Sequence, residues 1–230
     1  MINTWNESLL HEELKDRYCS DRAQKEVPLE GSICDVVNPD GSVIEIQTRA
    51  LGKLKRKLEK LLPERRVTVI FPVPQNTIIE TFTSEGNLKS RRKSPSHHSI
   101  YKVFEEITGI AHLLPHNNLT ITVVLSDILE LRKDDGQGSW RRKGISIIDK
   151  KLVSIHKEYH LHNREDYLDL LPQSMSQPFT VEELRDQGVG KAAGKMAWVL
   201  RKAGILELAG KKGRAYLYKT ANVRATPVTE

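Results

Sequence analysis

The sequence predicts an α/β fold followed by a small C-terminal domain built from helices and a hairpin. Two observations carry this prediction. Between residues 6 and 155, short β-branched and apolar runs alternate with helices that have an apolar stripe. After a stretch rich in proline, serine and glutamine, the pattern changes to short helices and a terminal strand pair. The expected division is a first domain over residues 1–171, a linker over 172–178, a second domain over 179–220 and a tail over 221–230.

Composition restricts the class of protein. The chain has 230 residues, 38% of them hydrophobic and 29% charged, with a formal net charge of +6. A basic balance favours an acidic partner such as nucleic acid. Two cysteines form neither a disulfide framework nor a four-thiolate zinc site. No apolar run approaches the roughly 18 residues of a membrane helix, and the polar N-terminus is unlike a secretory signal. We therefore expect a cytoplasmic protein without a membrane partner.

The first elements are predicted by apolar spacing and turn residues. A helix is expected over residues 6–18. Two short strands, at 32–37 and 42–48, flank Asn38-Pro39-Asp40-Gly41, which is a strong turn signal. A helix with a leucine stripe and a basic outer face follows at 50–62, and then a strand at 66–73 that is apolar throughout its centre.

The remainder of the first domain is predicted by the same rules. Residues 84–98 are polar and basic, and are expected to form a loop or an exposed hairpin arm. The other expected elements are a strand at 77–82, a helix at 99–114, a strand at 119–131, a charged loop at 133–143 and a hairpin around 144–155.

The turn between the first two strands predicts a carboxylate pair. Pro39 and Asp40 suit the centre of a type I turn, and Gly41 suits the left-handed position after it. This register pairs Asn38 with Ser42, so Asp35 opposes Glu45 at about 5 Å on one face. Gln47 shares that face, whereas Val36, Ile44 and Ile46 point toward a core. Opposed like charges destabilise a sheet, and a divalent cation between them removes the conflict.

The order of these elements resembles the PD-(D/E)XK nuclease superfamily, the restriction-endonuclease-like fold. The matching features are an acidic helix, a strand with Asp35, a turn, a strand with Glu45 and Gln47, then a basic helix and another strand. The resemblance covers residues 5–75 well and continues loosely to 170. An alternative is that Asp35 and Glu45 are ordinary polar positions on an exposed hairpin face.

The resemblance implies roles for individual residues. Asp35 and Glu45 would bind Mg²⁺ or Mn²⁺, and the acidic residue often supplied by the first helix would be Glu12 or Glu13. Gln47 occupies the position that usually holds lysine, and would orient water by hydrogen bonding without a positive charge. Lys53 or Arg49 would alternatively supply that charge.

The C-terminal segment resembles a winged helix-turn-helix over residues 176–220. Thr180 and Glu183 form the pattern of a capping box at a helix start. A second helix is expected over 191–203, with Trp198 directed into the core of the domain, and Gly204 is expected to end it. Strands are expected at 205–209 and 214–219. The resemblance implies contacts with double-stranded DNA from the second helix and the hairpin tip. The candidate residues are Lys191, Lys195, Arg201, Lys202, Lys211, Lys212 and Arg214.

These expectations combine into a metal-dependent DNA endonuclease, or a nuclease-fold DNA-processing protein, whose second domain recruits the DNA. Two alternatives remain open at this point. Gln47 favours a DNA-binding or regulatory protein with a nuclease fold that no longer cuts. A protein–protein adaptor, in which neither domain touches DNA, is the other. The sequence does not decide whether the nucleic acid is DNA or RNA, or whether the protein is a monomer or a homodimer.

Overall fold

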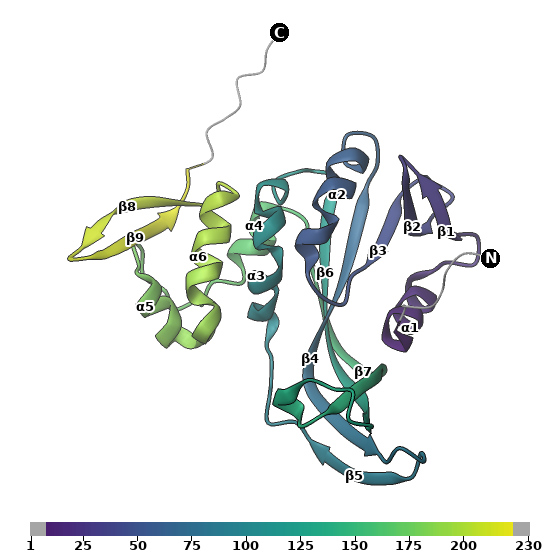
Figure 1. The fold of residues 1–230 in the computed structure, drawn as a ribbon. Helices are drawn as coiled ribbons and strands as arrows, with labels where there is room; N and C mark the ends of the chain where they lie inside the picture. Colours follow the sequence, from purple (N-terminus) through teal and green to yellow (C-terminus); the bar gives the residue numbers. More distant parts are fainter. Residues whose placement is uncertain (1–7, 223–230) are drawn as a thin grey trace.

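The computed structural model of the protein describes residues 8–222, which form a mixed sheet with helices on both faces (Figure 1). The strand order is β1-β2-β3-β4-β6-β7, and β5 pairs with the far end of β4. Strands β3, β4 and β6 are mutually parallel, and the other pairs are antiparallel. The sheet strands are β1 (Gln24–Leu29), β2 (Ser32–Val37), β3 (Val43–Ile46), β4 (Val67–Phe82), β5 (Leu88–Lys93), β6 (Leu119–Asp134) and β7 (Ile145–Leu161).

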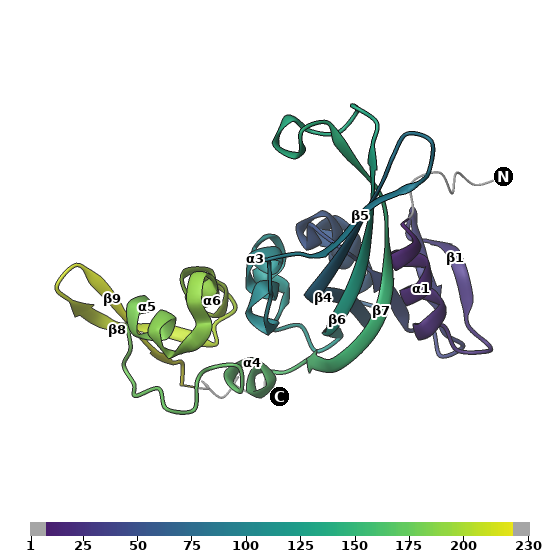
Figure 2. The same cartoon turned by 90° about the horizontal axis from the view of Figure 1, so that it is seen from below.

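Helices cover the two faces of the sheet unequally (Figure 2). Helix α1 (Leu9–Tyr18) covers one face, where Leu10 and Leu14 pack with Ile46 and Ile70. The predicted helix at 6–18 therefore begins at Leu9 with Ser8 as its N-cap, and positions 6 and 7 lie outside the described residues. The opposite face carries the larger core and the helices α2 (Lys55–Leu61) and α3 (Val103–Glu106), with the 3₁₀ helices η1 (Leu51–Leu54), η2 (Ile100–Lys102) and η3 (Ile107–Leu113).

The β2–β3 hairpin has the predicted register. Val36 lies opposite Ile44 and Val37 opposite Val43. The Asn38 N–H donates to the Ser42 carbonyl at 2.9 Å, and Gly41 takes the left-handed conformation at φ +77°. The predicted turn is confirmed, because a three-residue loop of this type requires a left-handed residue at its last position.

Strand β4 is one element where the sequence predicted two. It continues from Val67 through Pro72 and Pro74 to Phe82, paired with β6 along its length. Proline interrupts a central strand because it lacks an N–H. However, β3 ends opposite Ile70, so β4 has β6 on one side only where the two prolines lie. The prediction of separate strands at 66–73 and 77–82 was therefore wrong.

Two other predictions need correction. The helix expected at 99–114 is a chain of short turns, η2, α3 and η3, rather than one α-helix. The hairpin expected within 144–155 is a single long strand, β7, whose partner is β6. By contrast, residues 84–98 form the exposed end of the β4–β5 hairpin, which is one of the two expected alternatives.

The C-terminal segment packs on the main body. Thr180 caps α5 (Val181–Leu184) in a complete capping box with Glu183, as predicted. Helix α6 (Ala193–Lys202) buries Met196 and Leu200 in the same core as α2 and α3. Trp198 is 47% exposed, so its predicted core position is wrong. The other elements are α4 (Arg164–Leu168), the turns Trp140–Arg142 (η4), Arg185–Val189 (η5) and Gly190–Ala192 (η6), and the hairpin strands β8 (Leu206–Lys212) and β9 (Ala215–Thr220).

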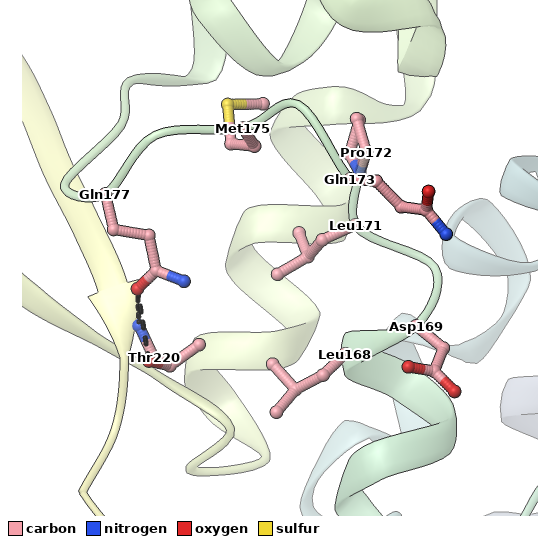
Figure 3. Close-up of a pocket in the computed structure, with 8 residues that line it drawn as sticks. All are labelled: Leu168, Asp169, Leu171, Pro172, Gln173, Met175, Gln177 and Thr220. Atoms are coloured by element: carbon pink, nitrogen blue, oxygen red, sulfur yellow. Dashed lines mark hydrogen bonds between the residues drawn. The ribbon is translucent and has the colours of Figure 1, made fainter.

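The predicted linker at 172–178 is fastened at its far end. Gln177 Oε1 accepts hydrogen bonds from the Thr220 N–H at 2.8 Å and the Thr220 hydroxyl at 3.1 Å (Figure 3). A hollow of about 480 Å³ lies between this segment and the end of α4. Of the predicted tail, residues 223–230 lie outside the described part of the chain. Within that part, no helix has the length and apolar character needed to cross a membrane.

A close backbone approach sets the position of α2. A Cβ added to Gly109 in η3 would lie 2.8 Å from the Cα of Gly52 in η1. We expect Gly109→Ala to lower the free energy of unfolding by about 1–3 kcal/mol, because the helices must move apart. Urea denaturation measures this. Gly194→Ala in α6 is the control, since its Cβ would meet only Val181 at 3.9 Å. Equal stabilities of the two variants would contradict the packing argument.

Candidate active site

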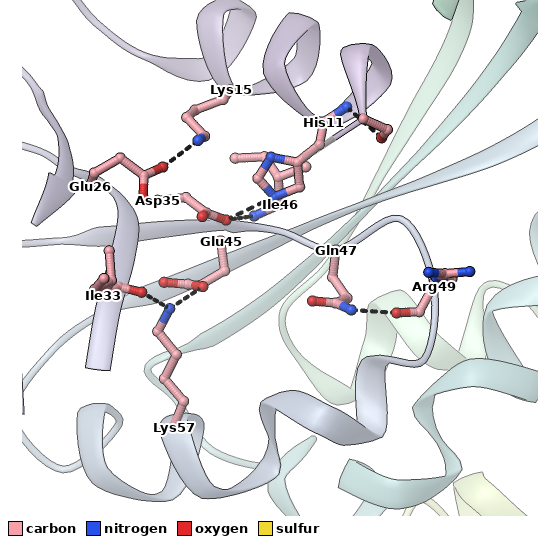
Figure 4. A network of polar contacts seen from close by, with 11 residues as sticks. His11, Lys15, Glu26, Ile33, Asp35, Glu45, Ile46, Gln47, Arg49 and Lys57 are labelled. Atoms are coloured by element: carbon pink, nitrogen blue, oxygen red, sulfur yellow. Dashed lines mark hydrogen bonds and ion pairs between the residues drawn. The ribbon is translucent and has the colours of Figure 1, made fainter. Parts of the chain in front are cut away.

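The β2–β3 hairpin holds Asp35 and Glu45 between α1 and α2 (Figure 4). Continuation of the observed register places the two residues opposite each other. Their side chains turn toward different helices, since Asp35 contacts His11 of α1 and Glu45 contacts Lys57 of α2. The sequence had predicted that both would project from one shared face. The Asp35 carboxylate departs from that arrangement because it accepts a hydrogen bond from the Ile46 N–H at 2.7 Å.

Asp35 is held as a carboxylate by two donors. Its Oδ2 atom lies 3.4 Å from His11 Nε2 and accepts from the Ile46 N–H. Burial works against the charge, but these hydrogen bonds from His11 and Ile46 hold the pKa of Asp35 below its ordinary value. Asp35 is therefore ionised at neutral pH and can act as an oxygen ligand or hydrogen-bond acceptor.

Glu45 lies in a different environment. The residue is only 2% exposed, so it is not an ordinary polar position on an exposed hairpin face. Burial raises the pKa of Glu45 to about 7; the negative charge of Asp35 adds to this, and Lys57 opposes it. Lys57 Nζ bonds Glu45 Oε2 and also donates to the Ile33 carbonyl at 2.6 Å. The carboxyl group thus changes its charge near neutral pH.

The structure places the other predicted site residues apart from this pair. Glu12 is exposed in the first turn of α1. Glu13 accepts a hydrogen bond from the Leu152 N–H at 2.6 Å, so its carboxylate is held by an inner position of β7. Lys53 is exposed on η1, and the Gln47 side chain donates to the Arg49 carbonyl. The structure does not bring Glu12, Glu13 or Lys53 to the pair, so the roles predicted for them stay predictions without a contact to support them.

Three residues at the site were missed from the sequence. His11 and Lys15 lie four residues apart, on the side of α1 that faces the hairpin, and Lys57 reaches Glu45 from α2. Lys15 is 5% exposed and pairs with Glu26 of β1. Spacing of four residues was a usable signal, because such residues share one helix face. For Lys57, the seven other basic residues in the range 49–66 hid the one that points inward.

One oxygen of the buried Glu45 carboxyl group is left unsatisfied. Glu45 Oε1 is buried and has no hydrogen-bond partner among the described residues. An unsatisfied buried carboxylate oxygen is costly unless another group binds it. Within residues 8–222, no group of three or more His, Cys, Asp or Glu is placed to hold a metal ion. Two carboxylates with further positions left for water and phosphate are what Mg²⁺ usually takes from a protein.

The adjacent Cys34 is not suited to bind that ion. Burial raises the pKa of its thiol to about 11, with Lys57 opposing the shift and Glu45 adding to it. The group therefore stays protonated at neutral pH, and the thiolate is the form that binds metals. The polar chemistry of the site therefore rests on its carboxyl oxygens and not on sulfur.

A second set of candidate residues lies on the C-terminal segment. The exposed side of α6 presents Lys195, Trp198 and Lys202 at helical spacing. At the tip of the β8–β9 hairpin, Lys211 Nζ lies 5.0 Å from the centre of the exposed Tyr216 ring. All of the residues predicted to contact DNA are exposed: Lys191, Lys195, Arg201, Lys202, Lys211, Lys212 and Arg214.

Comparisons with known proteins identify a family. The chain matches the family described as "Domain of unknown function (DUF8091)" over residues 8–162, which is the stretch from α1 to the end of β7. A protein of Treponema pallidum (strain Nichols), described as uncharacterized, is 34% identical over 218 residues, covering 95% of this chain and 87% of its own length. No solved structure matches the chain significantly. From the extent of the first match, we conclude that the chain belongs to the DUF8091 family.

Proposed function

We propose that the protein is a metal-dependent deoxyribonuclease of the PD-(D/E)XK type. The observation that carries this proposal is the buried Glu45 carboxyl group, whose Oε1 makes no hydrogen bond to the described residues. By continuation of the hairpin register, residue 45 stands opposite the ionised Asp35. The order of elements around it is a helix, a hairpin with these two acids, a basic helix and a parallel strand. Asp35 and Glu45 would hold Mg²⁺ or Mn²⁺.

The bound ion would lower the pKa of a water molecule and neutralise developing charge on the phosphate. Water would attack phosphorus and give up a proton to solvent; the bond from phosphorus to the sugar oxygen would break, and that oxygen would take a proton from solvent. Lys57 supplies the positive charge that Gln47 lacks, because its ammonium already contacts Glu45. Its role in the reaction is to orient the attacking water and to stabilise negative charge on the phosphate. His11 keeps Asp35 in place through its hydrogen bond.

The test is incubation of supercoiled plasmid DNA with the protein and Mg²⁺ or Mn²⁺. Nicked or linear product that disappears with EDTA supports the proposal. Intact plasmid under every metal, with DNA binding retained, would contradict it.

That second outcome defines the alternative function. Gln47 stands where the superfamily usually has lysine, and its side-chain amide is bonded to the Arg49 carbonyl rather than to the carboxylates. A nuclease-fold protein that binds DNA without cutting it, and acts as a regulator, would have this feature. It predicts salt-dependent affinity for DNA with no cleavage.

The pKa of Glu45 predicts how cleavage depends on pH. A protonated carboxyl group does not bind a cation, so proton and metal compete for Glu45. At a limiting metal concentration, cleavage should rise about tenfold per pH unit below pH 7 and level off above it. Raising the Mn²⁺ concentration should move the midpoint to lower pH. A midpoint that does not respond to metal would assign the titration to another group.

The C-terminal segment is proposed to recruit duplex DNA as a winged helix. Helix α6 would lie in the major groove and the β8–β9 hairpin would reach the phosphates. The support is that α6 and the hairpin tip carry exposed groups of one charge sign, with Trp198 and Tyr216 exposed among them.

Salt dependence measures this contribution. For Lys195→Ala/Lys202→Ala, we expect the slope of log affinity against log salt to fall by about 2, since each lost phosphate contact removes about 0.9. The control Lys25→Ala removes an exposed charge on β1 and should leave the slope unchanged. Equal slopes for parent and double variant would argue against this DNA-binding surface.

A further inference from the structure

Two basic segments that are about fifty residues apart in the sequence form one projection. We call residues 83–98 and 132–147 together the arm. Parallel pairing of β4 with β6 continues to Phe82 and Lys133, which brings the β4–β5 and β6–β7 hairpins to the same end of the sheet. Lys89 and Asp134 form an ion pair between them. Figures 1 and 2 both show the hairpins extending side by side beyond the helices.

The arm holds the excess positive charge of the chain. Residues 83–98 contain four Lys or Arg and one Glu, and residues 132–147 contain five Lys or Arg and two Asp. Their combined net charge is +6, the same as that of the whole chain. The other segments are neutral in sum. A projection with this charge attracts a polyanion, and nothing about the core requires the charge to be there.

The tip of the arm presents an aromatic side chain. Trp140 is 83% exposed, and the Arg141 guanidinium lies 5.6 Å from its ring centre. The loop is ordered by backbone hydrogen bonds, including Gly138 N–H to the Gly144 carbonyl at 2.7 Å. A Cβ on Gly138 would lie 1.9 Å from the Ile145 carbonyl oxygen, so the loop depends on glycine there. The fold therefore holds a large aromatic side chain out in water beside a guanidinium group, at the tip of the most basic part of the chain.

The arm lies at a defined distance from the candidate active site. Glu45 pairs with Val69 of β4, and β5 of the arm pairs with Ile78–Phe82, which lie nine to thirteen residues further along that strand. At about 3.3 Å per residue, β5 is at most about 30–43 Å from Glu45 along the strand. One turn of duplex DNA spans about 34–36 Å. A hollow of about 290 Å³ lies between the two, and its charged lining has the basic residues Lys102, Arg132 and Lys150 together with Glu106 and Glu130.

We propose that the arm binds the flank of a DNA duplex about one helical turn from the cleaved phosphate. Arg141, Arg142 and Lys143, with the basic residues of β5, contact phosphates. Trp140 packs against bases or sugars in the groove, as apolar wedges do in proteins that grip DNA. The inference rests on the proposed function, since the active site must hold the same duplex.

The test compares binding of 12-base-pair and 40-base-pair duplexes by fluorescence anisotropy, with affinities corrected for the number of sites. The first variant is Arg141→Ala/Arg142→Ala/Lys143→Ala. On the long duplex its salt slope should fall by about 3, and on the short duplex it should match the parent. Trp140→Ala should weaken binding of the long duplex about tenfold without changing the slope.

The matched control, Arg17→Ala/Arg22→Ala/Lys25→Ala, removes three exposed charges from α1, the turn after it and β1, and should behave as the parent. Arm variants that bind the long duplex as tightly as the parent would overturn the inference and leave the proposed function standing. If the arm variants bound both duplexes more weakly by the same factor, the arm would not lie one helical turn from the cleaved phosphate. A parent protein that binds neither duplex would overturn the inference together with the proposed function.

Discussion

Replacing Glu45 with glutamine should lower the rate of DNA cleavage at least a thousandfold and leave DNA affinity unchanged. Glutamine keeps the size of the side chain but removes the charge that would hold the cation. A loss of about 4 kcal/mol of transition-state stabilisation corresponds to this factor. Single-turnover cleavage of a labelled duplex measures the rate, and anisotropy measures the affinity.

The control for this experiment is Glu59→Gln. Glu59 is an exposed carboxylate on α2 that lies 3.3 Å from His112 and takes no part in the site. It should cut DNA at the rate of the parent. Asp35→Asn should resemble Glu45→Gln, because both carboxylates would bind the same ion. If either site variant retained the activity of the parent, the pair would not be catalytic.

Replacing Lys57 with methionine should destabilise the protein in a pH-dependent way. Lys57 is the ion-pair partner of Glu45, whose side chain is 3% exposed. Removal of one partner from a buried pair leaves an uncompensated charge and costs about 3–5 kcal/mol. We expect a loss of this size at pH 8, where Glu45 is ionised, and a smaller loss at pH 5.5.

The sign follows from the raised pKa of Glu45. A folded-state pKa of about 7 lies above the ordinary value of 4.5, so the folded protein retains this proton to higher pH than the unfolded chain. The stabilisation that the folded protein gains from holding this proton on Glu45 is complete below pH 4.5, and it is lost as the pH rises through 7. Because Lys57 lowers the pKa of Glu45, its removal raises that pKa, and the stability then continues to fall at pH values above 7. Urea denaturation of Lys57→Met and Glu45→Gln/Lys57→Met tests this. The double variant leaves no unpaired buried charge at this position, so its stability should not show the extra loss at pH 8. Equal destabilisation at both pH values would refute the coupling.

The hairpin at the site could be predicted because its determinants are local. Asn38 to Gly41 specify the turn and, with it, the register of β2 and β3. Strand β2 has the bounds that the sequence indicated, Ser32 to Val37. The opposition of Asp35 and Glu45 follows from that register without any tertiary information.

The remainder of the site depends on packing that spacing does not reveal. Lys57 reaches Glu45 only because α2 crosses β2 and β3, and that crossing is set by the contact of Gly52 with Gly109. His11 was hidden by the acidic residues beside it, which the resemblance had favoured. The continuation of β4 through Pro72 could not be predicted, since it requires knowing where β3 ends.

The central claim is that a divalent ion binds between Asp35 and Glu45, and its most direct test locates the ion. Fe²⁺ in place of Mg²⁺, with ascorbate and peroxide, generates radicals that cut the polypeptide close to the metal. In the complex with duplex DNA, mass spectrometry should find scission within a few residues of positions 35 and 45, and none there in Glu45→Gln. Scission elsewhere in the chain, or an identical pattern in the variant, would contradict the claim.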